Sequence, residues 1–127
     1  MEGKGCTANV LMIYNNLLIC ANAGDSRCVL GEGGRAIPLS MDHKPTQKKE
    51  RERIYKAGST VNSEGRIDGN LNLSRAIGDV VHKKTPKLSL QEQAITSFPD
   101  IKMHQLSNKT DFAILGCDGI WETKTSQ

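Results

Sequence analysis

The sequence predicts an α+β domain whose main component is antiparallel β-structure. Short apolar runs separated by turn residues occupy residues 8–39, which is the pattern of a strand meander in an antiparallel sheet or sandwich. A charged segment at 47–57 has the composition of a helix, and an apolar run at 112–115 is typical of a buried strand. The 127 residues are enough for one domain with a single core, and nothing in them indicates a second domain.

The first two strands are predicted to form a hairpin. Segments 8–14 and 17–22 are rich in residues that favour strands, and Asn15 and Asn16 join them. Asparagine tolerates a positive φ angle, which a two-residue hairpin turn requires at both of its central positions. We therefore expect an antiparallel hairpin, continued by two further short strands before residue 40.

A helix is predicted over residues 47–57. Pro45 disfavours a helical conformation at Lys44, so the helix has to begin after this loop. Thr46 is a suitable N-cap, and Gly58 is suited to end the helix. The run of lysine, arginine and glutamate is interpreted as a solvated face with ion pairs one turn apart, not as a nucleic-acid patch.

Two further β-segments are predicted later in the chain. Residues 60–68 indicate a hairpin that turns around Gly65. Residues 101–106 alternate apolar and polar side chains like a half-buried strand, and His104 falls on the polar phase. We therefore expect His104 to face solvent.

A first candidate metal ligand follows the apolar run at 112–115. Asp118 is followed at once by Gly119, a residue that lets the backbone pass close to a ligand. If a helix begins here, Asp118 and Glu122 project to the same side, and two carboxylates could converge on a hard cation such as Mg²⁺ or Mn²⁺. The alternative is a tight Asp-Gly turn with Glu122 solvated in the first helical turn. Both interpretations remain open.

A second candidate metal ligand is Asp25, at the bend between the second and third predicted strands. Its carboxylate can cap nearby amides in an Asx-type turn, with Arg27 as a solvated or ion-paired neighbour. It can also act as a second carboxylate directed at a metal. The local sequence is compatible with either role.

Composition excludes several classes of function. The net charge of +3 is small and dispersed, and aromatic residues make up 4%, so the chain lacks the basic patch and stacking residues of a nucleic-acid-binding protein. No apolar stretch approaches the roughly 20 residues that span a bilayer, and no signal peptide is evident. Four cysteines without C-x-x-C spacing, each in or beside an apolar run, are expected to be reduced core residues. We expect an intracellular protein of the cytoplasm, the nucleus or both.

Several motifs together resemble those of the type 2C metal-dependent protein serine/threonine phosphatases. The matching segments are 5–8, 21–27, 39–45, 53–58, 69–79 and 117–121. They occur in the order and spacing of the family over nearly the whole chain. Residues 72–79 and 97–101 are most similar to the gamma isoform branch.

The resemblance implies an α-β-β-α sandwich of two antiparallel sheets with flanking helices, and a flap at about 42–72. It also implies hydrolysis of phosphoserine and phosphothreonine in protein substrates, with two Mn²⁺ or Mg²⁺ ions and a third, weaker metal site. By position, Asp118 matches the catalytic aspartate shared by the two-metal site. Asp25 and Glu122 match carboxylates of the third site, where many family members carry aspartate at the second position. Ser74, Arg75 and Asp79 match a structural motif of the family.

The resemblance covers only part of the family domain. The Arg and Glu-Asp segment, the Asp-Gly-His-Gly segment and the Asp-Asn pair of the family have no counterpart here. Residues 1–127 are therefore expected to be the central to C-terminal part of one catalytic domain, incomplete at both ends and inactive alone. The alternative is a noncatalytic binding or regulatory module derived from such a domain. Neither substrate-binding residues nor an oligomeric state is predicted.

Overall fold

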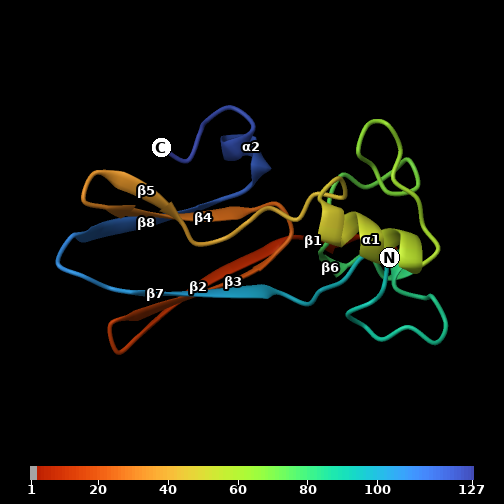
Figure 1. Ribbon diagram of the computed structural model, residues 1–127, viewed down its shortest axis with the longest axis horizontal. Helices are drawn as coiled ribbons and strands as arrows, with labels where there is room; N and C mark the ends of the chain where they lie inside the picture. The colour runs from red at the N-terminus through yellow and green to blue at the C-terminus, as the bar shows by residue number, and fades with distance from the viewer. Residues whose placement is uncertain (1–2) are drawn as a thin grey trace.

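The computed structural model describes residues 3–127 of the chain (Figure 1). Strands dominate this range, as the sequence predicts. The segment 112–115 is a strand as expected, but it is not buried, because Phe112, Ile114 and Leu115 are exposed. The elements are β1 (Gly5–Cys6), β2 (Ala8–Tyr14), β3 (Leu17–Ala23), β4 (Arg27–Glu32), β5 (Arg35–Pro38), α1 (Lys48–Lys56), β6 (Ile77–Gly78), the 3₁₀ helix η1 (Val80–His82), β7 (Asp100–Gln105), β8 (Thr110–Gly116) and α2 (Asp118–Trp121).

Two three-stranded antiparallel sheets face each other and enclose a core (Figure 1). One sheet has the order β2-β3-β7 and the other β5-β4-β8, while β1 and β6 form a small separate pair. The predicted α+β sandwich is therefore confirmed. Within residues 3–127, α1 lies beyond one end of the two sheets and does not cover a sheet face.

The β2–β3 hairpin forms in the predicted register. Tyr14 pairs with Leu17, so Asn15 and Asn16 are the two central residues of the turn. Their φ angles are 46° and 61°, the positive values that this turn requires.

A bend at residues 24–26 carries the chain from one sheet to the other. Gly24 has a φ of 122°, which favours glycine. A Cβ atom at this position would lie 2.4 Å from Cγ2 of Thr7, so the close approach of these two segments also requires glycine. Strands β3 and β4 consequently belong to opposite sheets instead of pairing as neighbours.

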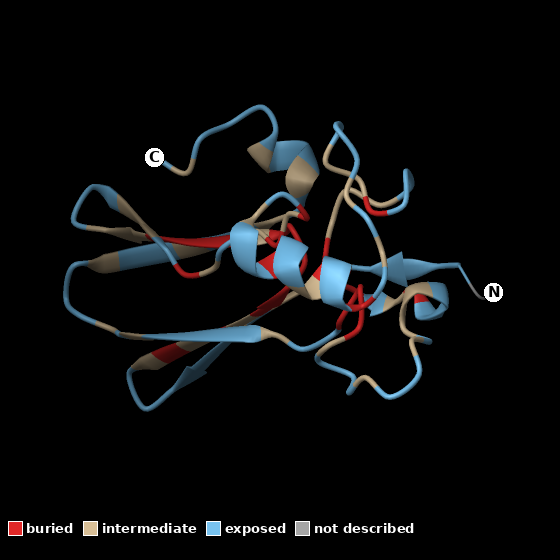
Figure 2. Ribbon diagram, turned by 45° about the vertical axis from the view of Figure 1, so that its right-hand side comes forward, coloured by how far each residue is buried: buried red, intermediate tan, exposed pale blue. Residues whose placement is uncertain are grey.

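The core between the sheets is built from alternate residues of the central strands. Leu18 and Cys20 from β3 meet Cys28 and Leu30 from β4, and Leu39 closes the cluster. All five are nearly or fully buried (Figure 2). Burying one leucine side chain stabilises a fold by about 1.5–3 kcal/mol, so this cluster is the main link between the sheets.

Strand β7 exists as predicted, but its two faces are the reverse of the expectation. Ile101 and Met103 point away from the core and are 57% and 63% exposed. His104 is half-buried, and its Nε2 lies 3.3 Å from Oε1 of Glu32 in the opposite sheet. Lys102 likewise donates to the backbone oxygen of Pro38. The polar face of β7 therefore links the two sheets.

The segment after β5 contains α1 and irregular loops around a second, smaller core. Ile54, Ile67, Ala76 and Ile95 form this core. Helix α1 begins after Gln47 and not after Thr46, and Gly58 follows its end with a φ of 89°.

The predicted hairpin at 60–68 is reduced to one isolated bridge between Val61 and Ile67. No helix in residues 3–127 is long and apolar enough to cross a lipid bilayer.

Candidate functional site

Pairing of β4 with β8 brings two of the candidate carboxylates to the same end of one sheet. Arg27 pairs with Gly116 in this antiparallel ladder. Asp25 lies two residues before Arg27, and Asp118 lies two residues after Gly116. Because β4 and β8 run in opposite directions, the N-terminal end of β4 and the C-terminal end of β8 lie at the same end of the sheet. Both aspartates therefore emerge at the end of the sheet that carries the bend and α2.

A helix begins at Asp118, as the metal-site interpretation requires. Cys117 is the N-cap of α2, and the amide of Glu122 donates to the backbone oxygen of Asp118 at 2.8 Å. Glu122 is therefore one helical turn after Asp118, on the same side of α2. Asp118 is half-buried and Glu122 is exposed. An exposed glutamate one turn away can reach a cation held by the aspartate only from the solvent side.

Asp25 is 3% exposed and is paired with a cation of this chain. Its Oδ2 accepts a hydrogen bond from Nζ of Lys44, which comes from the loop before α1. Within residues 3–127, Lys44 is the hydrogen-bond partner of this carboxylate, so Asp25 does not cap the turn. The ammonium group of Lys44 neutralises a charge that would be costly to bury alone.

Arg27 connects the aspartate bend, the loop before α1 and α2, and the sequence does not reveal this role. Its Nε and Nη2 each donate to the Asp42 carboxylate at 3.0 Å. Its guanidinium lies 5.2 Å from the ring centroid of Trp121 in α2, within the range of a cation–π interaction. The Trp121 indole N–H in turn donates to the Gly116 oxygen at 2.7 Å. These contacts fix where α2 starts.

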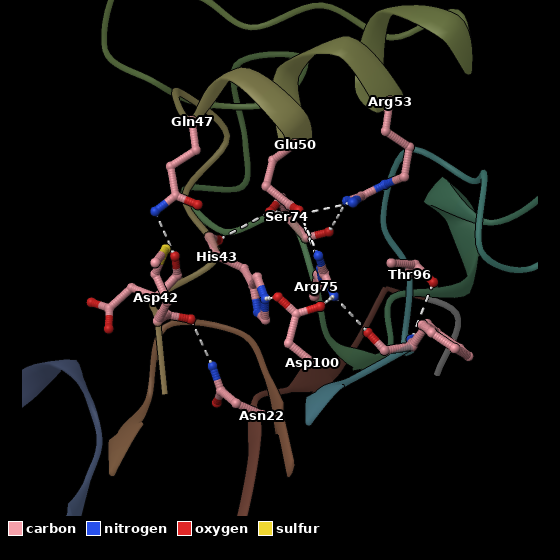
Figure 3. A network of polar contacts seen from close by, with 12 residues as sticks. Asn22, Asp42, His43, Gln47, Glu50, Arg53, Ser74, Arg75, Thr96 and Asp100 are labelled. Carbon is pink, nitrogen blue, oxygen red and sulfur yellow. Dashed lines mark hydrogen bonds and ion pairs between the residues drawn. The ribbon is translucent and has the colours of Figure 1, made fainter. Parts of the chain in front are cut away.

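A buried ionic network lies between α1 and the sheets, centred on Glu50 (Figure 3). Arg75 holds both oxygens of Glu50, with Nη2–Oε1 at 2.7 Å and Nε–Oε2 at 3.1 Å. Arg53 and Ser74 also donate to Oε2, at 2.7 Å and 2.6 Å. Burial alone would raise the pKa of Glu50. The hydrogen bonds from Arg75 and Ser74 and the charge of Arg53 outweigh burial and lower this pKa to about 2.

The expectation of a uniformly solvated helix face is therefore wrong for Glu50 and Arg53. Glu50 is 2% exposed although it stands in a run of charged residues. Its partner Arg75 belongs to the predicted structural motif, and the network gives this motif a physical role. The pairing joins residues 25 positions apart, and helical periodicity carries no signal for it.

The network continues through Asp100 to His43 (Figure 3), and from His43 it reaches the Asp25 bend at Gly24. Nη1 of Arg75 donates to Oδ1 of Asp100 at 2.7 Å, and Nε2 of His43 lies 3.2 Å from Oδ2 of Asp100. The amide of Gly24 donates to Nδ1 of His43 at 3.1 Å. Burial and the positive charge of Arg75 lower the pKa of His43, although Asp100 opposes this.

Residues 3–127 do not by themselves form a metal site. Within this range no three histidine, cysteine, aspartate or glutamate side chains lie close enough together to hold a metal ion. Asp25, Asp118 and Glu122 share one end of the sandwich but are not a complete ligand set. Mg²⁺ and Mn²⁺ need about six oxygen donors, so further donors would have to come from elsewhere.

Comparison with known proteins gives a consistent assignment over the whole chain. The sequence profile of the protein phosphatase 2C family matches residues 2–127. The chain is 52% identical to Protein phosphatase 2C homolog 2 of Hypocrea jecorina over 126 residues, which are 99% of this chain and 28% of the relative. It is also 48% identical to Protein phosphatase 1G of Rattus norvegicus, over 100% of this chain and 25% of the relative, in agreement with the predicted similarity to the gamma branch.

Solved structures agree with the sequence relatives. A crystal structure of a phosphatase from a pathogenic strain of Toxoplasma gondii superimposes with a TM-score of 0.77 and 42% identity. The match covers 84% of this chain and 33% of that structure. The chain thus spans less than a third of the curated relative from Hypocrea jecorina and about a third of this solved structure.

Proposed function

Because the chain belongs to the protein phosphatase 2C family, we propose that the complete protein hydrolyses phosphoserine and phosphothreonine in protein substrates. The family depends on Mg²⁺ or Mn²⁺. The observation that supports this proposal is the arrangement at one end of the β5-β4-β8 sheet. There the β4–β8 register supports a common location for Asp25 and Asp118, the two aspartates that the family resemblance marks as metal-directed.

In this proposal Asp118 is the ligand shared by two metal ions, while Asp25 and Glu122 serve a third site. Two divalent cations would supply an activated water and offset charge on the phosphoryl oxygens. The role of this chain is to hold Asp118 at the start of α2, which Arg27 and Trp121 fix in place. For Asp25 to bind a cation, its carboxylate would have to leave Lys44 or be shared with it.

We further propose that the 127-residue chain alone has little phosphatase activity. Three carboxylates are too few to hold two hard cations in water, and one of these carboxylates is already paired with a lysine. In the complete protein, the remaining ligands would come from segments outside residues 1–127.

The test compares this chain with a chimaera. In the chimaera, the chain replaces the matching 126 residues of Protein phosphatase 2C homolog 2 of Hypocrea jecorina. Phosphate release from a phosphothreonine peptide is measured with and without Mn²⁺. We expect Mn²⁺-dependent turnover by the chimaera, a loss of about 100-fold or more in Asp118→Asn, and no turnover by the chain alone.

Glu52→Gln is the control substitution for this assay, because Glu52 is an exposed glutamate of α1. A chimaera that is folded and binds Mn²⁺ but does not turn over the peptide would contradict the proposal. That outcome would favour the noncatalytic binding or regulatory module instead. Equal turnover by the wild-type and Asp118→Asn chimaeras would contradict the assignment of Asp118.

A further inference from the structure

His43 joins three separate segments with all four of its polar groups. Its backbone N–H donates to the Gly24 oxygen at 3.0 Å, and its own oxygen accepts from the Ser74 amide at 3.0 Å. Its ring accepts the Gly24 amide at Nδ1, at 3.1 Å. Nε2 of the ring faces Asp100 at 3.2 Å (Figure 3). The residue is 2% exposed. Water therefore cannot replace these partners without opening the fold.

The hydrogen bonds determine which ring nitrogen carries the proton. A backbone N–H can only donate, so Nδ1 of His43 has to accept with its lone pair. In a neutral ring the proton is then on Nε2, which donates to the Asp100 carboxylate. An imidazolium ring, or the opposite tautomer, would place two N–H groups against each other at Gly24.

Asp100 is held in turn by the buried arginine. Arg75 donates to Asp100 from one side of its guanidinium and to Glu50 in α1 from the other. A continuous series of hydrogen bonds therefore runs from α1 through Arg75, Asp100 and His43 to the Gly24 amide. The residue directly after Gly24 is Asp25.

We propose that His43 is a positioning residue that fixes the Asp25 bend. It accepts the Gly24 amide at Nδ1, and the Asp100–Arg75–Glu50 network holds its ring in that orientation. The role of Asp25 as a metal-directed carboxylate rests on the function proposed above. The attachment of the bend to α1 through His43 does not depend on that function. A change in the position of α1 would reach Asp25 through this series of contacts.

The first test reads the tautomer directly in the wild-type chain. Nitrogen-15 NMR of the imidazole rings at pH 7.5 distinguishes a protonated from an unprotonated ring nitrogen. The proposal predicts that His43 has an unprotonated Nδ1 and a protonated Nε2. A protonated Nδ1 would overturn it, and this measurement does not depend on any variant being folded.

The second test uses amide hydrogen exchange at Gly24, with Leu39 as an internal reference. Leu39 is 1% exposed, and its amide is bonded to the Cys28 oxygen at 2.9 Å, away from the network. In His43→Asn the side-chain oxygen can replace Nδ1, whereas in His43→Gln the side-chain amide reaches the Nε2 position instead. Relative to Leu39, we expect Gly24 exchange to rise tenfold or more in His43→Gln and to stay within threefold in His43→Asn.

A third variant tests the remote support of the ring. Asp100→Asn keeps the size of the side chain but places an amide donor against either Nε2 of His43 or Nη1 of Arg75. We expect Gly24 exchange to accelerate tenfold or more in this variant relative to Leu39 as well. Equal effects on Gly24 and Leu39 in His43→Gln and Asp100→Asn would mean that both only destabilise the whole fold, and would overturn the proposal. None of these experiments measures phosphatase activity, so their results do not depend on whether the proposed function is correct.

Discussion

Glu50 is a residue whose position is decided by distant partners and not by its neighbours. It stands among six other lysine, arginine and glutamate residues of α1, yet it is buried and accepts hydrogen bonds from Arg53, Ser74 and Arg75. A buried carboxylate is tolerated only when its charge and its oxygens are satisfied, and here they are. Without the carboxylate charge of Glu50, the positive charges of Arg53 and Arg75 would be close together and less well neutralised.

The first prediction concerns the substitution Glu50→Gln. We expect a loss of about 3–5 kcal/mol in the free energy of unfolding, because the buried guanidinium of Arg75 loses its charged partner. Urea denaturation followed by circular dichroism measures the change. The matched control is Glu52→Gln on the exposed side of the same helix, which should change stability by less than about 0.5 kcal/mol. Similar losses in both variants would show that the network does not stabilise the fold.

The second prediction concerns pH. Glu50 has a folded-state pKa of about 2 against an ordinary value of 4.5, and the pKa of His43 is lowered from 6.5. In both cases the unfolded chain takes up protons before the folded one, so stability falls as the pH falls. The His43 contribution is lost first, below pH 6.5, and the Glu50 contribution is lost between about pH 4.5 and 2.

Urea midpoints measured from pH 7.5 down to pH 3 test this prediction. His43→Asn should reduce the decrease just below pH 6.5 and leave the decrease below pH 4.5 in place. A midpoint that stays constant, or rises, as the pH falls below 6.5 would contradict the assigned directions.

At the scale of secondary-structure elements, the β2–β3 hairpin could be predicted because its determinants are local. Two asparagines adopt the positive φ angles that the turn needs, and the flanking strands supply the register. Strand β7 shows the limit of such reasoning. Alternation locates a strand but does not say which phase faces the core, and here polar Lys102 and His104 face the opposite sheet. Partners 64 and 72 residues away decide that orientation.

The third prediction concerns the hairpin turn. Asn16 has a φ of 61°, so Asn16→Ala forces an alanine into the left-handed region and should cost about 1 kcal/mol of folding free energy. Asn16→Gly is the matched variant, since glycine adopts this conformation without strain and should be neutral or slightly stabilising. Urea midpoints of the two variants provide the comparison. Equal midpoints would mean that the turn conformation does not limit stability.

At the scale of the whole molecule, packing of the two sheets determines the chemical state of the cysteines. Cys20 and Cys28 come from opposite sheets and are buried free thiols, as expected. The expectation of a core position is wrong for Cys6 and Cys117, which are exposed free thiols. Burial, with the adjacent Cys20 thiol, raises the pKa of Cys28 to about 12. Because the thiolate is the reactive form, the core cysteines should be inert while the sheets stay packed.

The fourth prediction uses this difference to test the sandwich. Ellman's reagent should modify two of the four thiols rapidly in the native chain and all four after denaturation in urea. The exposed positions can be confirmed with Cys6→Ser and Cys117→Ser, each of which should remove one fast equivalent. Rapid modification of all four thiols without denaturant would mean that the two sheets do not pack as described.

The candidate site divides in the same way into a predictable and an unpredictable part. Asp118 and Glu122 follow from a local pattern, an apolar strand that ends in a carboxylate and a helix. The location of Asp25 at the same end of the sheet as Asp118 depends on the β4–β8 register, and the roles of Arg27 and His43 depend on contacts between distant segments. Local sequence patterns contain the first kind of information, whereas only the assembled fold contains the second.

We propose that Asp118 and Asp25 direct their carboxylates at metal ions at one end of the β5-β4-β8 sheet. Mn²⁺ binding to the chimaera, followed by electron paramagnetic resonance, tests it most directly. We expect Asp25→Asn to remove only the weakest Mn²⁺ site and Asp118→Asn to weaken the tight sites as well. Unchanged Mn²⁺ binding in both variants, with the fold retained, would show that neither aspartate is a metal ligand.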